Sequence, residues 1–470
     1  MVFSSPVFLF LFLTAVYILY RITPTITAKN ILLLIFSVFF YAYGEPKAIV
    51  LMLISITMNY IFGLAMSKSC KARKLVLGLS VAANLGMLGV FKYAAFAAEA
   101  VNLLPFVSVP IPKIALPIGI SFYTFQAMSY VIDSYKNPQY IQKNPYKVAL
   151  YITFFPQLVA GPIVKYYDIA DQIDNRTHSP EMTAQGIRRF ITGLSKKLFI
   201  ANTMAIAADS VYALDTNELS LPLAWLGAVA YLFQIYFDFS GYSDMAIGLG
   251  KMFGFKFREN FNYPYISSSI QEFWRRWHIS VSTWFKEYLY IPLGGNRKGR
   301  LRTALNKLAV FFCTGLWHGA SLNFIVWGLL NGAFMMLESY KLIKTEKWFR
   351  PLRHIYALFV TVIAFVFFRA DTLGEAVRFI GHMFNPFAAA NNSQAWALFM
   401  EQLTPMFILM LISAVIFSMP VRKIIVGRIK SKELLLCGEV GSYVISLVML
   451  MLCIVTLSSA SYNPFIYFRF

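Results

Sequence analysis

Two histidines stand out among the residues whose types could do chemistry. The chain has only five histidines, and one of them, His318, lies in the motif WHGAS within the apolar stretch 304–338. An ionisable side chain at hydrocarbon depth is costly and is by default a candidate for function. A neutral imidazole can take up a proton near neutral pH, as a general base must. A structural histidine that donates to a backbone carbonyl between packed helices would fit the same position.

The second candidate, His278, lies in a segment that mixes aromatic and basic residues, FWRRWHISVSTWFKEY. Such a segment is amphipathic and is expected to lie in the plane of the membrane interface. Its residues Trp274, Arg275, Arg276 and Trp277 are candidates to line or support a site. Tryptophan and arginine favour headgroup depth whatever the function, so an interfacial anchor is the alternative.

Further candidates to line or support the site are Trp317 and Asn323, near His318, and two carboxylates in the motif YFDFSGYSDMAIG, Asp238 and Asp244. Carboxylates inside an apolar stretch should face a polar cavity or pair with a cation. A helix cap or hydrogen-bond anchor is the alternative interpretation.

The elements that must position these residues are membrane helices. The chain of 470 residues is 58% hydrophobic and only 14% charged, whereas soluble proteins are about 25% charged. Its formal net charge of +20 could indicate nucleic acid, but the basic residues cluster in short segments between apolar runs, as in cytoplasmic loops. We therefore expect a lipid membrane and no nucleic acid as partner. The four cysteines have no metal-ligand spacing, so no metal site is predicted.

Hydropathy and the positive-inside rule predict about 11–12 transmembrane helices with both termini outside the cytoplasm. The first apolar run lacks a basic start and a cleavage site, and is expected to be a retained span. The proline-broken stretch 151–163 is expected to be re-entrant or interfacial, and 371–401 an outer loop. The predicted spans are 6–20, 31–43, 48–66, 75–98, 114–134, 188–214, 219–250, a pair around His318, 355–368, 403–420 and 440–457.

Two long motifs, FWRRWHISVSTWFKEYLYIPLGGNRKG and GLWHGASLNFIVWGLLNG, resemble the membrane-bound O-acyltransferase family. The similarity is to its bacterial branch, which contains the alginate O-acetylation membrane protein and the D-alanyl transfer protein of teichoic acid modification. QIYFDFSGYSDMAIG and RENFNYPY also match, and PLGGNRKGR favours the alginate-type subgroup. The resemblance runs from about residue 115 to the carboxy terminus and is strongest over 234–331.

The resemblance implies an all-α polytopic membrane fold. Its helices would form a ring with re-entrant or interfacial helices, and an outer funnel would meet an inner tunnel near a central histidine. We expect a single integral-membrane acyltransferase domain over 1–470, with amino-terminal helices in 1–110, a core in 115–400 and carboxy-terminal helices in 403–470.

The resemblance also implies a reaction. An acyl group would pass from a cytoplasmic donor to an external hydroxyl, with the family's central histidine at His318 and its second histidine at His278. A base that removes the hydroxyl proton contributes about a hundred- to ten-thousand-fold to such a transfer, and we assign this role to His318. His278 would orient the acyl carbonyl or help the thiolate leave.

The expected partners follow from the same resemblance. No bound cofactor is expected, and acetyl-CoA would be the acyl donor substrate. An extracytoplasmic acetyltransferase of the SGNH or serine-esterase type would receive the acyl group for a polysaccharide acceptor. The protein is expected in the bacterial inner membrane as a multi-pass protein.

The carboxy-terminal sequence FIYFRF resembles the terminal motif of the small partner protein in the D-alanylation system. It indicates that Tyr467 accepts the acyl group, helped by His318, and passes it to the external enzyme; tyrosine can act as such a covalent carrier beside a base. An aromatic membrane anchor is the alternative.

Three other functions remain open at this point. The acyl group could be D-alanyl, for transfer to teichoic acid, or a longer chain. The chain could be a polysaccharide transporter or channel without chemistry, or a scaffold that recruits an external enzyme. The acceptor polymer is not readable from the sequence.

Overall fold

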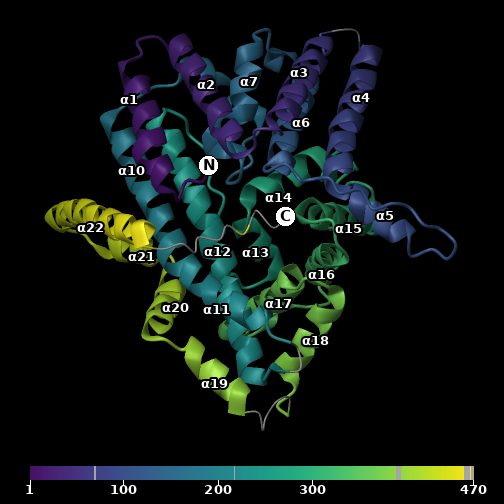
Figure 1. Cartoon of the computed structure of the whole chain (residues 1–470), viewed down its shortest axis with the longest axis vertical. Coiled ribbons are helices and arrows are strands. Elements are labelled where there is room, and N and C mark those ends of the chain that lie inside the picture. Colours follow the sequence, from purple (N-terminus) through teal and green to yellow (C-terminus); the bar gives the residue numbers. More distant parts are fainter. Residues whose placement is uncertain (68–69, 216–217, 388–392, 460–465, 467–470) are drawn as a thin grey trace. The chain divides into compact units, whose positions relative to one another are not determined.

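The computed structural model describes residues 1–67, 70–215, 218–387, 393–459 and 466, and within these residues all regular secondary structure is helical (Figure 1). The chain forms two compact units. The first comprises residues 1–190 and 243–259, and the second comprises residues 191–242 and 260–470. The all-α fold predicted from the sequence is confirmed.

The first unit contains the amino-terminal helices. They are η1 (Val7–Leu13), α1 (Thr14–Ile22), α2 (Ile26–Gly44), α3 (Ile49–Ala65), α4 (Cys70–Leu88), η2 (Gly89–Tyr93), α5 (Ala94–Val101), α6 (Ile120–Lys136), η3 (Pro138–Tyr140), α7 (Pro145–Thr153), α8 (Phe155–Leu158) and α9 (Tyr166–Asn175). Two helices, α10 (Pro180–Ser195) and α12 (Leu221–Met252), contribute residues to both units.

The second unit contains the helices around both candidate histidines. They are η4 (Lys196–Ala201), α11 (Asn202–Tyr212), η6 (Pro264–Ile266), α13 (Ile270–Arg276), α14 (Ile279–Phe285), η7 (Lys286–Tyr290), α15 (Gly299–His318), α16 (Leu322–Ser339), η8 (Thr345–Lys347), α17 (Arg350–Arg369), α18 (Leu373–Phe384), α19 (Ser393–Gln402), α20 (Pro405–Phe417), α21 (Val421–Arg428) and α22 (Lys432–Ser459).

The chain is a multi-pass membrane protein. In the described part, six helices are long and apolar enough to cross a membrane: 26–44, 72–101, 221–252, 322–339, 350–369 and 432–459. The bent pair 394–402 and 405–417, with an angle of 63° between its halves, makes a seventh if it counts as one span. Two shorter apolar helices cover 7–22 and 49–65. The sequence predicted 11–12 spans, more than these six or seven. The larger number includes segments such as 188–214, which the structure divides among α10, η4 and α11.

Two segments differ from their expected structures. The stretch 371–401, expected as an outer loop, contains α18, which begins at a capping box formed by Thr372 and Glu375. Its buried residues Ala376, Phe379 and Met383 recur at helical spacing, so this helix buries an apolar face. In the aromatic segment that begins at α13, the alternative interpretation was an interfacial anchor that faces lipid, but Trp274, Trp277 and Trp284 are all buried in the protein.

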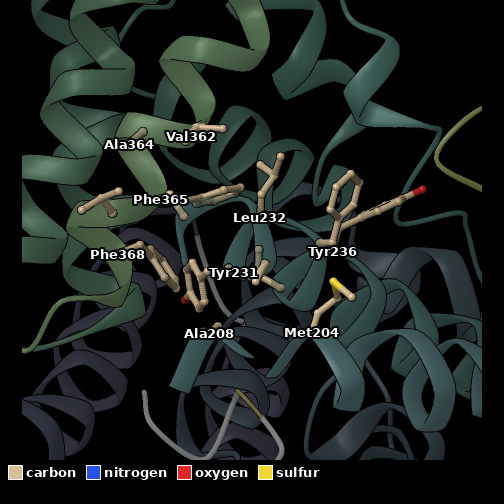
Figure 2. Close-up of a cluster of buried hydrophobic side chains, with 14 of the residues drawn as sticks. Met204, Ala208, Tyr231, Leu232, Tyr236, Val362, Ala364, Phe365 and Phe368 are labelled. Carbon is tan, nitrogen blue, oxygen red and sulfur yellow. The ribbon is translucent and has the colours of Figure 1, made fainter. Parts of the chain in front are cut away.

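The core of the second unit is a cluster of buried aliphatic and aromatic side chains (Figure 2). Figure 2 labels nine of them, from α11, α12 and α17: Met204, Ala208, Tyr231, Leu232, Tyr236, Val362, Ala364, Phe365 and Phe368. The same cluster includes Trp277, next to one candidate histidine, and Trp327 of α16. The candidate site is therefore built on the hydrophobic core of this unit.

Candidate active site

His318 is held by the close packing of two consecutive helices. It is the last residue of α15, and the chain continues through Gly319 in an extended conformation into α16. A Cβ atom on Gly319 would lie 2.1 Å from the ring of Phe324, and one on Gly315 would lie 2.3 Å from the Phe324 carbonyl oxygen. The glycines of the GLWHG sequence thus let α16 pack directly on the end of α15.

His278 lies in the turn between α13 and α14. Its backbone is left-handed, with φ 42° and ψ 54°, a conformation that is uncommon for a residue with a side chain and must be held by its surroundings. Asn260 supplies that restraint. Its carbonyl oxygen accepts the backbone N–H of Ile279 at 2.9 Å, and its Oδ1 accepts the N–H of Ser280 at 3.2 Å and the Ser280 hydroxyl at 2.9 Å.

These hydrogen bonds also fix the tautomer of His278. A backbone N–H can only donate, so the side-chain atom of Asn260 that faces Ser280 must be the oxygen. The Nδ1 atom of His278 lies 3.2 Å from this same oxygen. Nδ1 must therefore carry the hydrogen in the neutral ring, which leaves the lone pair on Nε2.

Both histidines line one small cavity. Its volume is about 10 Å³, which is room for about one water molecule. The two imidazole centroids are 6.2 Å apart, and the side chains are almost fully buried, with 1% of His278 and 5% of His318 exposed. The other lining residues are Ile235, Phe239, Trp277, Trp327, Phe365, Phe368 and Ile466. Because most of the wall is aromatic, any larger group must displace side chains to enter.

A buried ion pair connects this cavity to the carboxy-terminal tail. The Nζ atom of Lys197 lies 2.7 Å from Asp238 Oδ1, which makes the two side chains an ion pair. The contact is not also a hydrogen bond, because its geometry does not meet the angle that a hydrogen bond requires. Only 4% of the Lys197 side chain and 3% of the Asp238 side chain are exposed. Asp238 Oδ2 accepts the backbone N–H of Ile466 at 2.9 Å, and Ile466 lines the cavity. Tyr467 itself lies outside the described residues.

Three other predicted site residues lie around the cavity without lining it. The Trp317 ring is 4.8 Å from the His318 ring, between centroids. Trp274 donates its indole N–H to Asn331 Oδ1 at 3.1 Å, which joins α13 to α16. Asn323 donates to the carbonyl oxygen of Ala370 at 2.6 Å.

The remaining predicted residues are placed elsewhere. Arg275 is exposed. Arg276 pairs with Glu272 at 2.9 Å. Asp244 belongs to the first unit, where it pairs with Arg189 at 2.6 Å.

Sequence analysis missed three residues that shape the site: Asn260, Lys197 and Trp327. Asn260 lies in the RENFNYPY motif and Trp327 in the motif that contains His318, so both fall inside segments that carry the family resemblance. Lys197 follows Lys196 inside the predicted span 188–214, and a lysine within a membrane span is itself a signal for a buried acidic partner. Within the described ranges, no group of three or more histidine, cysteine, aspartate or glutamate side chains could hold a metal ion.

Two imidazoles that line a small, mostly aromatic cavity can move protons for a reaction that excludes water. Comparisons with known proteins agree with this chemistry. The model of the membrane-bound O-acyltransferase family matches residues 34–371. The chain is 39% identical to the probable alginate O-acetylase AlgI of Pseudomonas putida, with 100% of both chains covered. It is 38% identical to the peptidoglycan O-acetyltransferase of Helicobacter pylori, over 82% of this chain and 80% of that protein.

A more distant relative is the teichoic acid D-alanyltransferase of Bacillus subtilis, at 27% identity over 57% of this chain and 71% of that protein. The family model spans most of the chain, including the His278 turn and the α15–α16 pair. The chain therefore belongs to the membrane-bound O-acyltransferase family.

Proposed function

We propose that this chain transfers an acetyl group from acetyl-CoA on the cytoplasmic side to a hydroxyl on the outer side, for O-acetylation of an extracellular or cell-wall polysaccharide. The observation that carries the proposal is the shared cavity of His278 and His318, which the tail residue Ile466 also lines. Relatives named as an alginate O-acetylase and a peptidoglycan O-acetyltransferase support acetyl as the group and a polysaccharide as the final acceptor.

The reaction assigns a role to each imidazole. His318 removes the proton from the acceptor hydroxyl, whose oxygen attacks the thioester carbonyl. The C–O bond forms, the C–S bond breaks, and the thiolate of coenzyme A leaves with the proton that His318 took up. To accept this proton, the His318 ring must start the reaction neutral. His278 Nε2 then offers a second atom that accepts a proton.

A ring of about 11–12 spans with an outer funnel and an inner tunnel would bring the two substrates to this cavity from opposite sides. The positive-inside rule supports placing both termini outside the cytoplasm. In this arrangement the chain acts as one integral-membrane acyltransferase domain in the bacterial inner membrane.

Tyr467 is proposed as the first acyl acceptor. Its neighbour Ile466 is fixed by Asp238 and lines the histidine cavity, which supports a tail that enters the site. An acyl-tyrosine would then pass its group to an extracytoplasmic SGNH or esterase-like acetyltransferase, and that partner would modify the polymer.

The deciding experiment measures release of CoA and transfer of label from [¹⁴C]acetyl-CoA by the purified chain in detergent. The wild type is expected to turn over acetyl-CoA. His318→Ala is expected to lose turnover by about a hundred- to ten-thousand-fold. Tyr467→Phe should insert normally and carry no label on the tail.

The rival functions predict different results. Full polymer acetylation in cells by His318→Ala would favour a transporter or scaffold without chemistry. Labelling only from a D-alanyl carrier protein, with none from acetyl-CoA, would favour D-alanyl transfer. Full polymer acetylation by Tyr467→Phe would rule out the tyrosine relay and leave the acyltransferase activity in place.

A further inference from the structure

An acyl-transfer site needs a hydrogen-bond donor for the carbonyl oxygen, because that oxygen becomes negative as the hydroxyl attacks. One such donor contributes about a hundred- to thousand-fold to the rate. His278 does not supply it in the resting state. Its only ring hydrogen is on Nδ1, which is committed to Asn260 Oδ1, and its Nε2 can only accept. The donor must come from another lining residue.

Trp327 is a lining residue with a fully buried, unused donor. Its side chain is 2% exposed, and its indole N–H meets no nitrogen or oxygen acceptor in the part of the chain that the structure describes. A buried donor left unsatisfied costs about 1–3 kcal/mol, so it requires an explanation.

Two other tryptophans of the same unit use their indole N–H in hydrogen bonds. The indole N–H of Trp274 donates to Asn331 Oδ1 at 3.1 Å, and that of Trp225 donates to the carbonyl oxygen of Met383 at 2.8 Å. Trp327 differs from both because it lines the histidine cavity. Its ring thus forms part of the wall of the cavity that both imidazoles line.

The position of Trp327 is rigid. Its ring packs edge-on against His318, with centroids 5.0 Å apart, and against Phe368 at 4.9 Å. The side-chain amide of Asn331 donates to its backbone carbonyl at 2.8 Å. A donor held in this way stabilises developing charge without reorganisation at the moment of reaction.

We propose that the indole N–H of Trp327 binds the carbonyl oxygen of the acyl thioester and stabilises the oxyanion that forms there, an inference that rests on the proposed acyl transfer. The acceptor oxygen forms its bond to the carbonyl carbon, and the C=O electron pair moves to the oxygen that Trp327 holds. When this pair returns, the C–S bond breaks and the thiolate leaves. The hydroxyl proton passes to His318 and then to the thiolate.

The test removes the indole N–H while keeping the ring. Trp327 is replaced by its sulfur isostere, 3-benzothienyl-alanine, and separately by phenylalanine, and acetyl-CoA turnover is measured on the full chain in detergent. We expect kcat to fall by about a hundred- to thousand-fold in both variants, with KM for acetyl-CoA changed little. Trp225→Phe is the matched control, since its N–H is bonded to a backbone carbonyl away from the cavity; it should keep wild-type kcat.

A second measurement does not depend on turnover. Acetonyl-CoA keeps the carbonyl but cannot be cleaved, and its binding should shift the ¹⁵N–¹H signal of the Trp327 indole, assigned by its loss in Trp327→Phe. Full kcat in the isostere, or an unshifted indole signal with acetonyl-CoA bound, would overturn the role of Trp327 and leave the proposed function standing. A wild type that neither cleaves acetyl-CoA nor binds acetonyl-CoA would overturn both.

Discussion

Helix α12 carries two buried carboxylates whose cationic partners differ in exposure. Asp238, in the second unit, is 3% exposed and faces Lys197, whose side chain is 4% exposed. Asp244, in the first unit, is 9% exposed and pairs with Arg189, whose side chain is 31% exposed. Arg189 also binds Glu259, which is 55% exposed, through two hydrogen bonds of 3.0 Å and 2.5 Å.

The difference separates a positioning role from a structural one. An ion pair taken out of water gains little stability over an apolar pair of the same size, because desolvation offsets the attraction between the charges. The Lys197–Asp238 pair is therefore better explained by what it holds, the backbone of Ile466 beside the cavity. The Arg189 network is partly solvated and links three segments of the first unit, so its function is structural.

The largest expected effect comes from removing one partner of the buried pair. Lys197→Met leaves the Asp238 carboxylate buried without its cation, which costs about 3–5 kcal/mol. We expect a clear fall in the midpoint of thermal unfolding in detergent. An unchanged midpoint would show that water reaches Asp238 and would remove the contrast between the two carboxylates.

A paired set of double variants separates stability from function. Lys197→Met with Asp238→Leu replaces both charges, so the stability should return to the wild-type level or above it. Its acyl-transfer rate should nevertheless fall at least about tenfold, because the hydrogen bond to the Ile466 N–H is lost. A tenfold change corresponds to ~1.4 kcal/mol, the size of one hydrogen bond. Lys197→Met with Asp238→Asn keeps an acceptor for the Ile466 N–H and should transfer at close to the wild-type rate. Thermal unfolding and acetyl-CoA turnover are measured on each, and equal rates in both would contradict the positioning role.

A smaller effect is expected in the first unit. Arg189→Gln should lower the free energy of unfolding by about 1 kcal/mol, less than Lys197→Met, because Arg189 and Glu259 are partly solvated although Asp244 is buried. The difference from the wild type should shrink as salt is added, since solvated charges are screened. If Arg189→Gln lowered the unfolding free energy as much as Lys197→Met does, removing the cation would cost the same at Asp244 as at Asp238. The two carboxylates would then not differ.

The smallest effect is expected for Glu259→Gln. More than half of its side chain is exposed, so the change in unfolding free energy should be within about 0.5 kcal/mol, as for most surface substitutions. Acetyl-CoA turnover should not change. This variant is the control for the other substitutions. A loss of turnover here would mean that the Arg189 network also affects acyl transfer, and would contradict its purely structural role.

The sequence predicted the family and the two histidines because both rest on local motifs, RRWHIS and WHGAS. It also predicted the all-α class, from hydropathy together with the family resemblance. The roles of Asn260 and Trp327 could not be predicted, because they depend on which polar atoms find partners after folding. α18 was expected as a loop because hydropathy was used to find membrane spans, and this amphipathic helix of 12 residues is too short to be one.

The tryptophans of α13 and its neighbours show a second limit. A mixture of tryptophan and arginine is typical of the membrane interface, yet Trp274 and Trp277 belong to the core. Composition alone cannot tell a ring that faces lipid from one that faces another helix, since both surroundings are apolar.

The water-sized cavity between the two imidazoles has one consequence for the cell that makes this protein. A bacterial membrane stores energy as a proton gradient, and any continuous file of water through an enzyme would discharge it. A space that admits about one water molecule, walled by aromatic rings, breaks such a file at the level of His278 and His318. An acyl group that enters between the two imidazoles must therefore displace some of these rings.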